Sequence, residues 1–358
     1  MVFAPPKKYW LFSAPVDLLT FLGSALASFV ALWIGAVVGV LHDDTPEWMW
    51  IPAILLIDVA HVHATAFRVY FDTDEFWRNP WLYILTPAIG LAIGIALYSE
   101  GHLLFWRTLA YLAVFHFVRQ QYGWVILYRA RAGECDALGQ WIDTAAIYAA
   151  TLYPLIYWHT HLPRNFWWFL TDDFTSLPVI FTPIAQPVYW TIMAAYIGKS
   201  LYGYFFGRTG NPGKDIVVIT TAICWYVGII SFNSDYAFTV TNVIIHGIPY
   251  FVLVYWYSRQ RAQQTTTNTT YRLLTRTPLL FLGALWFLAY IEEYMWDRTL
   301  WHERSWLFGS AWSITDLSVI IVPLLVLPQV THYVLDGFIW KREQHPLLNR
   351  LVATEELR

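Results

Sequence analysis

The chain has 358 residues, of which 57% are hydrophobic and 13% are charged. Soluble domains average about 25% charged residues, so this composition excludes an ordinary soluble protein and indicates a protein that crosses a membrane several times. The formal net charge is -3, and without a dense basic cluster there is no reason to expect a nucleic-acid partner.

A helix that crosses a bilayer needs roughly 20 predominantly apolar residues, and about ten segments of the chain meet this requirement. In chain order they are residues 16–41, 48–71, 81–98, 102–129, 140–158, 184–207, 214–232, 236–257, 278–296 and 312–340. We therefore predict an all-α, polytopic membrane helix bundle in which residues 1–340 form a single transmembrane domain. Residues 341–358 are expected to form a cytoplasmic amphipathic tail on the inner leaflet.

The distribution of basic residues predicts the orientation, because Lys and Arg accumulate in cytoplasmic loops. With the N-terminus inside, most of the 22 Lys and Arg residues fall on the cytoplasmic side. The opposite side holds Arg107, Arg164, Arg298 and Arg304. We therefore expect both termini in the cytoplasm and the protein in the inner, or cytoplasmic, membrane of the cell.

Four of the ten segments carry ionisable or amide side chains inside apolar runs. Such groups are costly in a membrane, so each one is a functional hypothesis. The second segment contributes Asp58, His61, His63 and Arg68, and the fourth contributes His116, Arg119 and Gln120. The eighth contributes Asn242, His246 and Tyr250, and the tenth contributes His332 and Asp336.

The four histidine-bearing segments all run from outside to inside in this orientation. Counted from the cytoplasmic end of its segment, each histidine lies about 8 to 13 residues deep, a spread of roughly one and a half helical turns. We therefore predict that His61, His116, His246 and His332 converge on one metal site, with Asp58 and Asp336 as carboxylate ligands. His63 is a second choice for His61, because residues two apart on a helix point in different directions.

Imidazole and carboxylate ligands favour iron, copper or zinc over magnesium or calcium. Oxidation of a hydrocarbon needs a redox cofactor, so we expect non-haem iron, mono- or dinuclear, with copper or zinc as alternatives. The expected substrate is a lipid or isoprenoid that enters from the bilayer, with an electron donor on the cytoplasmic side. Tyr250 and Gln120 are candidate catalytic residues. Arg68 and Arg119 are candidates for binding an anionic headgroup.

In residue type and architecture the chain resembles the polyhistidine integral-membrane oxygenases. Among these, desaturases and hydroxylases carry boxes with adjacent histidine pairs, and this sequence has no such pair. The carotene-cleaving Brp/Blh-like proteins are more similar, because they too distribute single histidines through a hydrophobic bundle. The resemblance implies a membrane-bound non-haem iron oxygenase, and it assigns no individual residue. The runs His61-Val-His63 and His246-Gly-Ile-Pro-Tyr250 also resemble ligand segments of haem–copper oxidases.

Two other functions use the same residues. A proton- or metal-ion-coupled transporter would relay protons or bind its ion with the intramembrane His and Asp side chains, although no internal repeat of the kind common in transporters is visible. A haem-binding membrane subunit would use pairs of the histidines as axial ligands.

Overall fold

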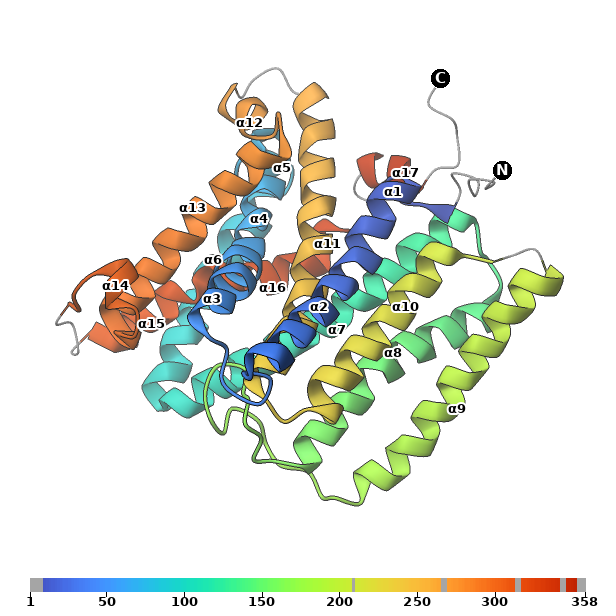
Figure 1. Ribbon diagram of the computed structural model, residues 1–358. Coiled ribbons are helices and arrows are strands. Elements are labelled where there is room, and N and C mark those ends of the chain that lie inside the picture. Colours follow the sequence, from blue (N-terminus) through green and yellow to red (C-terminus); the bar gives the residue numbers. More distant parts are fainter. Residues whose placement is uncertain (1–8, 208–209, 265–268, 313–316, 342–345, 353–358) are drawn as a thin grey trace. The chain divides into compact units, whose positions relative to one another are not determined.

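The computed structural model describes residues 9–207, 210–264, 269–312, 317–341 and 346–352. These residues form helices and contain no strand, so the all-α prediction is confirmed. Figure 1 shows the helices in chain order. Their ends are set by familiar signals, such as the Asp136 carboxylate, which accepts a hydrogen bond of 2.7 Å from the Gly139 N–H at the start of α8.

The chain folds into two compact units, where the sequence analysis expects one domain. Unit 1 comprises Met1–Pro46, Val114–Pro249 and Arg342–Arg358, and unit 2 comprises Glu47–Ala113 and Tyr250–Lys341. The elements of unit 1 are α1 (Ala14–Asp17), η2 (Leu18–Leu22), α2 (Gly23–Val38), α8 (Ala137–Thr160), α9 (Phe181–Tyr202), η4 (Gly203–Gly207), α10 (Pro212–Trp225), η5 (Tyr226–Ser231) and α17 (Pro346–Val352). Here α denotes α-helix and η denotes π-helical turns.

The elements of unit 2 are α3 (Glu47–Trp50), η3 (Ile51–Val59), α4 (Ala60–Arg68), α5 (Thr73–Arg78), α6 (Pro80–Glu100), α12 (Thr269–Leu274), α13 (Pro278–Trp296), η6 (Asp297–Trp301), α14 (Ser305–Phe308), α15 (Ser318–Leu325) and α16 (Leu327–Ile339). Two long helices, α7 (His102–Ala132) and α11 (Asp235–Gln264), contribute residues to both units. Over most of its described residues, every segment expected from the sequence corresponds to helix in the structure.

Six helices of the described chain are long and apolar enough to cross a membrane. They span Ala14–Val38, Glu47–Arg68, Pro80–Glu100, Pro212–Ser231, Asp235–Gln264 and Pro278–Trp301. A seventh span results if α15 and α16, which meet at a bend of 42°, are counted together. Pro323 within α15 and Pro328 in the first turn of α16 account for this break, because proline cannot donate the helical hydrogen bond. The composition therefore supports a multi-pass membrane protein, but not the count of ten spans or the location of the termini.

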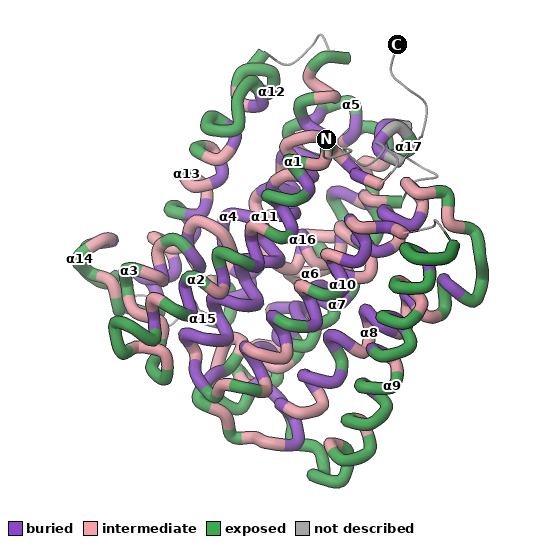
Figure 2. Tube along the Cα trace, turned by 45° about the vertical axis from the view of Figure 1, so that its right-hand side comes forward, coloured by how far each residue is buried: buried purple, intermediate pink, exposed green. Residues whose placement is uncertain are grey.

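Aromatic packing forms the core of unit 1. The Trp158 side chain at the end of α8 is fully buried against the Phe166 and Phe238 rings, at centroid distances of 4.6 and 5.1 Å. Helix α9 lies beside α8 (Figure 1) and is exposed along most of its length (Figure 2), so its apolar outer face is suited to lipid.

Unit 1 also contains a buried set of ion pairs, which we call the ionic cluster. The Asp143 carboxylate on α8 accepts hydrogen bonds from Arg129 on α7, from Lys199 on α9 at 2.5 Å and from Lys214 on α10 at 2.9 Å. Glu134 pairs with Arg129 at 3.0 Å and with Lys214 at 2.5 Å. Asp143, Arg129 and Lys214 are each less than 5% exposed. The ionic cluster therefore joins four consecutive helices of unit 1.

Unit 2 is built on α4, α11 and α13, which bury Phe67, Tyr250, Phe281 and Leu285 in one apolar core. Helix α6 packs against α15 and α16. A Cβ atom at Gly90 would lie 3.0 Å from Val330, and one at Gly94 would lie 3.0 Å from Pro323. These two glycines, spaced as small-xxx-small, allow the close approach of helices that is common in membranes.

The C-terminal segment contains a short helix, α17, whose leucines face the protein. Leu347, Leu348 and Leu351 are each at most 6% exposed. The rest of the predicted tail, residues 342–345 and 353–358, lies outside the described residues. The amphipathic character expected of this segment is thus used, in the described part, to bury leucines in unit 1.

Candidate metal centre

Two of the predicted histidines meet within unit 2. His61 lies on α4 and His332 on α16, and their rings pack edge to face with centroids 5.0 Å apart. Both side chains are at most 1% exposed. Helix α4 follows the π-helical turns of η3, which widen the helix just before His61 and which often occur at functional sites.

A hydrogen-bond chain fixes the His332 ring. The distances are 2.8 Å from His332 Nδ1 to Thr65 Oγ1, 3.1 Å from Thr65 Oγ1 to Tyr250 Oη and 2.6 Å from Tyr250 Oη to Asp336 Oδ1. The Asp336 carboxylate can only accept when ionised, so Tyr250 donates to it and Thr65 donates to Tyr250. His332 then donates its Nδ1–H to Thr65, which fixes the ring in the tautomer whose Nε2 atom carries the lone pair.

The other two histidines meet within unit 1, in an apolar environment. His116 on α7 and His246 on α11 pack edge to face with centroids 5.1 Å apart, and they are 4% and 0% exposed. The Phe117 ring stacks on His246 at 3.5 Å, and Trp168 packs on Phe117 in turn. The Gln120 amide donates a hydrogen bond of 2.8 Å to the His246 backbone carbonyl.

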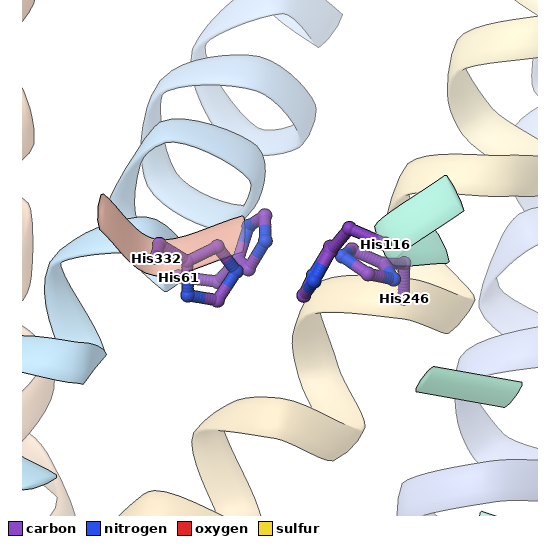
Figure 3. Close-up of side chains that lie close together, drawn as sticks. All are labelled: His61, His116, His246 and His332. Carbon is purple, nitrogen blue, oxygen red and sulfur yellow. The ribbon is translucent and has the colours of Figure 1, made fainter. Parts of the chain in front are cut away.

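Figure 3 draws the four histidines of these two pairs, and all four are buried. Four neutral imidazoles are a donor set that iron, copper and zinc accept.

The two predicted carboxylate ligands lie near the histidine pair of unit 2. Asp58 Oδ1 is 3.6 Å from His61 Nδ1, and its side chain is 34% exposed. Asp336 accepts hydrogen bonds from Tyr250 and from Trp340 Nε1, the latter at 3.1 Å. The carboxylates are therefore placed to orient histidine and tyrosine side chains.

His63 points to a different neighbour from His61, as expected for residues two apart on the regular helix α4. Its Nε2 atom lies 2.8 Å from Glu292 Oε2 on α13. Glu292 is not conspicuous in the sequence, because an acidic residue near the end of an apolar segment is adequately explained by solvation at the membrane interface. In the structure Glu292 is 6% exposed.

The two arginines proposed to bind a headgroup differ in accessibility. Arg68 is fully buried, donates to the Ile339 carbonyl at 2.8 Å and lies 3.3 Å from Glu75. These contacts hold α4 to its neighbours in unit 2 and leave the guanidinium inaccessible to a lipid. Arg119 is exposed, and it donates to Tyr148 Oη at 2.7 Å.

Comparisons with family models, with curated proteins and with solved structures give no match for this chain.

Proposed function

We propose that the protein is a membrane-bound metal oxidoreductase that uses His61, His116, His246 and His332 to bind one redox-active metal ion. The observation that carries the proposal is that each unit brings together one pair of buried histidines, and that the four come from four different helices. Histidines this deeply buried are expensive in a membrane and usually functional. We propose non-haem iron as the ion, with copper or zinc as alternatives.

The chemistry that the bound ion supplies is the activation of dioxygen for attack on a hydrocarbon. The surrounding side chains hold the site dry and hold His332 in the metal-binding tautomer through Thr65 and Tyr250. By residue type and architecture, the proposal groups the chain with the polyhistidine membrane oxygenases. Gln120, whose buried carbonyl oxygen has no hydrogen-bond partner among the described residues, is available to a substrate or to a water molecule.

An apolar groove in unit 2 supports the proposal that the substrate is hydrophobic. The cavity has a volume of about 450 Å³ and is lined by α6, α7 and α16, almost entirely with apolar side chains such as Leu85, Ile89 and Leu109. Its α6 wall runs from Trp81 to Leu97, a length of about 24 Å. Val330 and Val334 form its α16 wall, on the helix that carries His332. These dimensions suit the hydrocarbon chain of a lipid or an isoprenoid.

Two reaction types fit this proposal, and their stoichiometries differ. Hydroxylation converts R–H to R–OH, consumes one O₂, two electrons and two protons, and releases one water, so it needs an external electron donor. Cleavage of a carbon–carbon double bond by one O₂ yields two carbonyl groups and needs no donor. Dependence of the reaction on added reductant therefore separates them.

The metal assignment is tested with His116→Ala and His332→Ala, purified in detergent and examined by elemental analysis and optical spectroscopy. We expect wild type to contain about one iron per chain at this site without a Soret band, and each variant to lose it. His102→Ala, which changes an exposed histidine, is the matched control and should retain the metal. Full metal content in both site variants would refute the assignment. A Soret band would favour the haem-binding subunit, and a metal-free wild type the transporter.

The substrate class is tested by mass spectrometry of lipid extracts from cells that express wild type or His332→Ala under ¹⁸O₂. We expect a lipid or isoprenoid product that carries ¹⁸O only with the wild-type chain. Identical extracts from the two strains would contradict an oxygenase.

We also propose that α7, α8 and α9 cross the membrane. Added to the seven candidate spans, which include the bent pair α15 and α16, they bring the count to ten. Both termini then lie in the cytoplasm, and the protein lies in the inner membrane of the cell. Helices α7, α8 and α9 each exceed 20 residues. The exposed Cys135 between α7 and α8 is then cytoplasmic. An impermeant maleimide should label it only after the membrane is opened, with Cys135→Ser as control. Labelling in intact cells would contradict this topology.

A further inference from the structure

Unit 2 contains a second group of buried polar atoms that the four-histidine proposal does not use. His63 on α4, Glu292 on α13 and Gln329 on α16 meet there. The Gln329 amide nitrogen donates to Glu292 Oε1 and so holds that carboxylate in place. Three helices of one unit thus direct polar side chains toward one position inside an apolar bundle.

The unusual feature of this group is that His63 and Glu292 lie within ion-pair distance of one another without a hydrogen bond between them. His63 Nε2 and Glu292 Oε2 lie 2.8 Å apart, yet both are buried atoms without a hydrogen-bond partner among the described residues. The Gln329 carbonyl oxygen is in the same condition. Buried polar atoms are nearly always hydrogen bonded, so three orphans in one place call for a ligand.

The spacing of the two atoms is that of two ligands on one metal ion. Zinc binds histidine nitrogen and carboxylate oxygen at about 2.0–2.2 Å, so neighbouring ligand atoms are roughly 3 Å apart and direct their lone pairs at the ion. This accounts for a short separation without the alignment that a hydrogen bond requires.

The charges of the neighbourhood also favour a cation. Glu292 interacts electrostatically with Asp58 and with Glu293, and Glu293 also interacts with Asp58, with Asp297 and with Arg304. Carboxylates that share an apolar region repel one another unless a cation or a proton lies between them. A divalent ion at His63 and Glu292 would neutralise this excess.

We propose that His63 and Glu292 bind a second divalent transition-metal ion, with Gln329 positioning the glutamate and Asp58 contributing negative charge. Imidazole nitrogen with carboxylate oxygen is a donor set for zinc, iron, cobalt or manganese. The inference is independent of the four-histidine proposal, because the two sites share no ligand.

The test is a titration with Co²⁺ of the full chain, stripped of metal and kept in detergent, followed by its absorption spectrum and by equilibrium dialysis. Wild type should bind two equivalents. Glu292→Gln and His63→Gln should each bind one, with the affinity of the lost site reduced at least about tenfold. Glu293→Gln, the matched control, alters a neighbouring acid for which no contact with His63 is observed and should still bind two.

The double variant His116→Ala/His246→Ala separates the two proposals. It should bind one equivalent, and adding Glu292→Gln should abolish that binding. Two equivalents in a Glu292→Gln protein of native size and helicity, or no Co²⁺ binding by the double variant, would overturn the second site. If instead the double variant binds as much as wild type, the four-histidine site fails while the second site stands.

Discussion

The ionic cluster of unit 1 and the histidine–acid region of unit 2 both place ionisable side chains in an apolar protein, but they satisfy them differently. In the ionic cluster each carboxylate is bonded to two or more cations, and Asp143 alone accepts from Arg129, Lys199 and Lys214. In unit 2 the His63 and Glu292 atoms face one another without a hydrogen bond. Buried polar groups that are bonded to one another hold helices together, whereas buried polar atoms without a hydrogen bond can bind a ligand.

The strongest test of this comparison removes the central charge of the ionic cluster. Asp143→Asn should destabilise the protein by about 3–5 kcal/mol, because it leaves the buried Arg129 and Lys214 with too little counter-charge. Unfolding in mixed detergent measures the loss. The same variant should leave metal content per folded chain unchanged, since no residue of the ionic cluster belongs to either proposed metal site.

Asp136→Asn is the matched control for the ionic cluster. Asp136 lies 3.4 Å from the same Arg129, but its side chain is 62% exposed. We expect Asp136→Asn to lower the free energy of unfolding by less than about 1 kcal/mol, because the pair is exposed and because asparagine preserves the helix cap. Equal losses of unfolding free energy in Asp143→Asn and Asp136→Asn would show that burial does not determine how much these ion pairs stabilise the protein.

In unit 2, Thr65→Val removes the hydrogen-bond partner of His332 Nδ1 with little change of shape. Because that bond selects the ring tautomer, metal affinity should fall roughly 10- to 100-fold. Competition with a chelator measures it, and Thr65→Ser, which keeps the hydroxyl, should bind like wild type. If valine at position 65 binds metal as tightly as threonine, the hydrogen-bond chain has no role in the site.

Tyr250→Phe removes a group one hydrogen bond further from His332 than Thr65, so it should lower the metal affinity less. It removes the phenol between Thr65 and Asp336, and Trp340 still donates to Asp336. A net hydrogen bond contributes about 0.5–1.5 kcal/mol, so the same chelator assay should show a loss below that of Thr65→Val. Tyr255→Phe, whose hydroxyl contacts an exposed Arg259, is the control. A larger loss for Tyr250→Phe than for Thr65→Val would reverse the proposed order of the chain.

Much of the fold was predictable because hydrophobicity over about 20 residues is a strong local signal. Segments 48–71 and 236–257, for example, correspond to Glu47–Arg68 and Asp235–Gln264. Pro323 and Pro328 indicate the break at Val326 in the sequence. The π-helical turns before His61 were not predictable, because they depend on packing against other helices. The division into two units depends on long-range contacts, which a single sequence does not display.

The candidate site was partly predictable for a similar reason. A histidine inside an apolar segment is conspicuous, so His61, His116, His246 and His332 stood out singly, and the placement of all four in one orientation linked them. The partners were harder to predict. Thr65 continues the polar stripe of Asp58, His61 and Arg68 in the sequence, but this spacing does not show that it contacts His332. Asp143 and Glu292 lie near segment ends, where solvation explains an acid equally well. Only tertiary structure shows that they are buried and what they contact.

The central claim is that four imidazoles bind one metal ion, and X-ray absorption spectroscopy of the metal-loaded Glu292→Gln protein tests it most directly. This variant removes the second proposed site, so the spectrum reports a single environment. We predict a shell of four imidazole nitrogens at about 2.0–2.1 Å, with the multiple scattering typical of histidine rings. A shell with two or fewer imidazoles, or one made of carboxylate and solvent oxygen, would contradict the account.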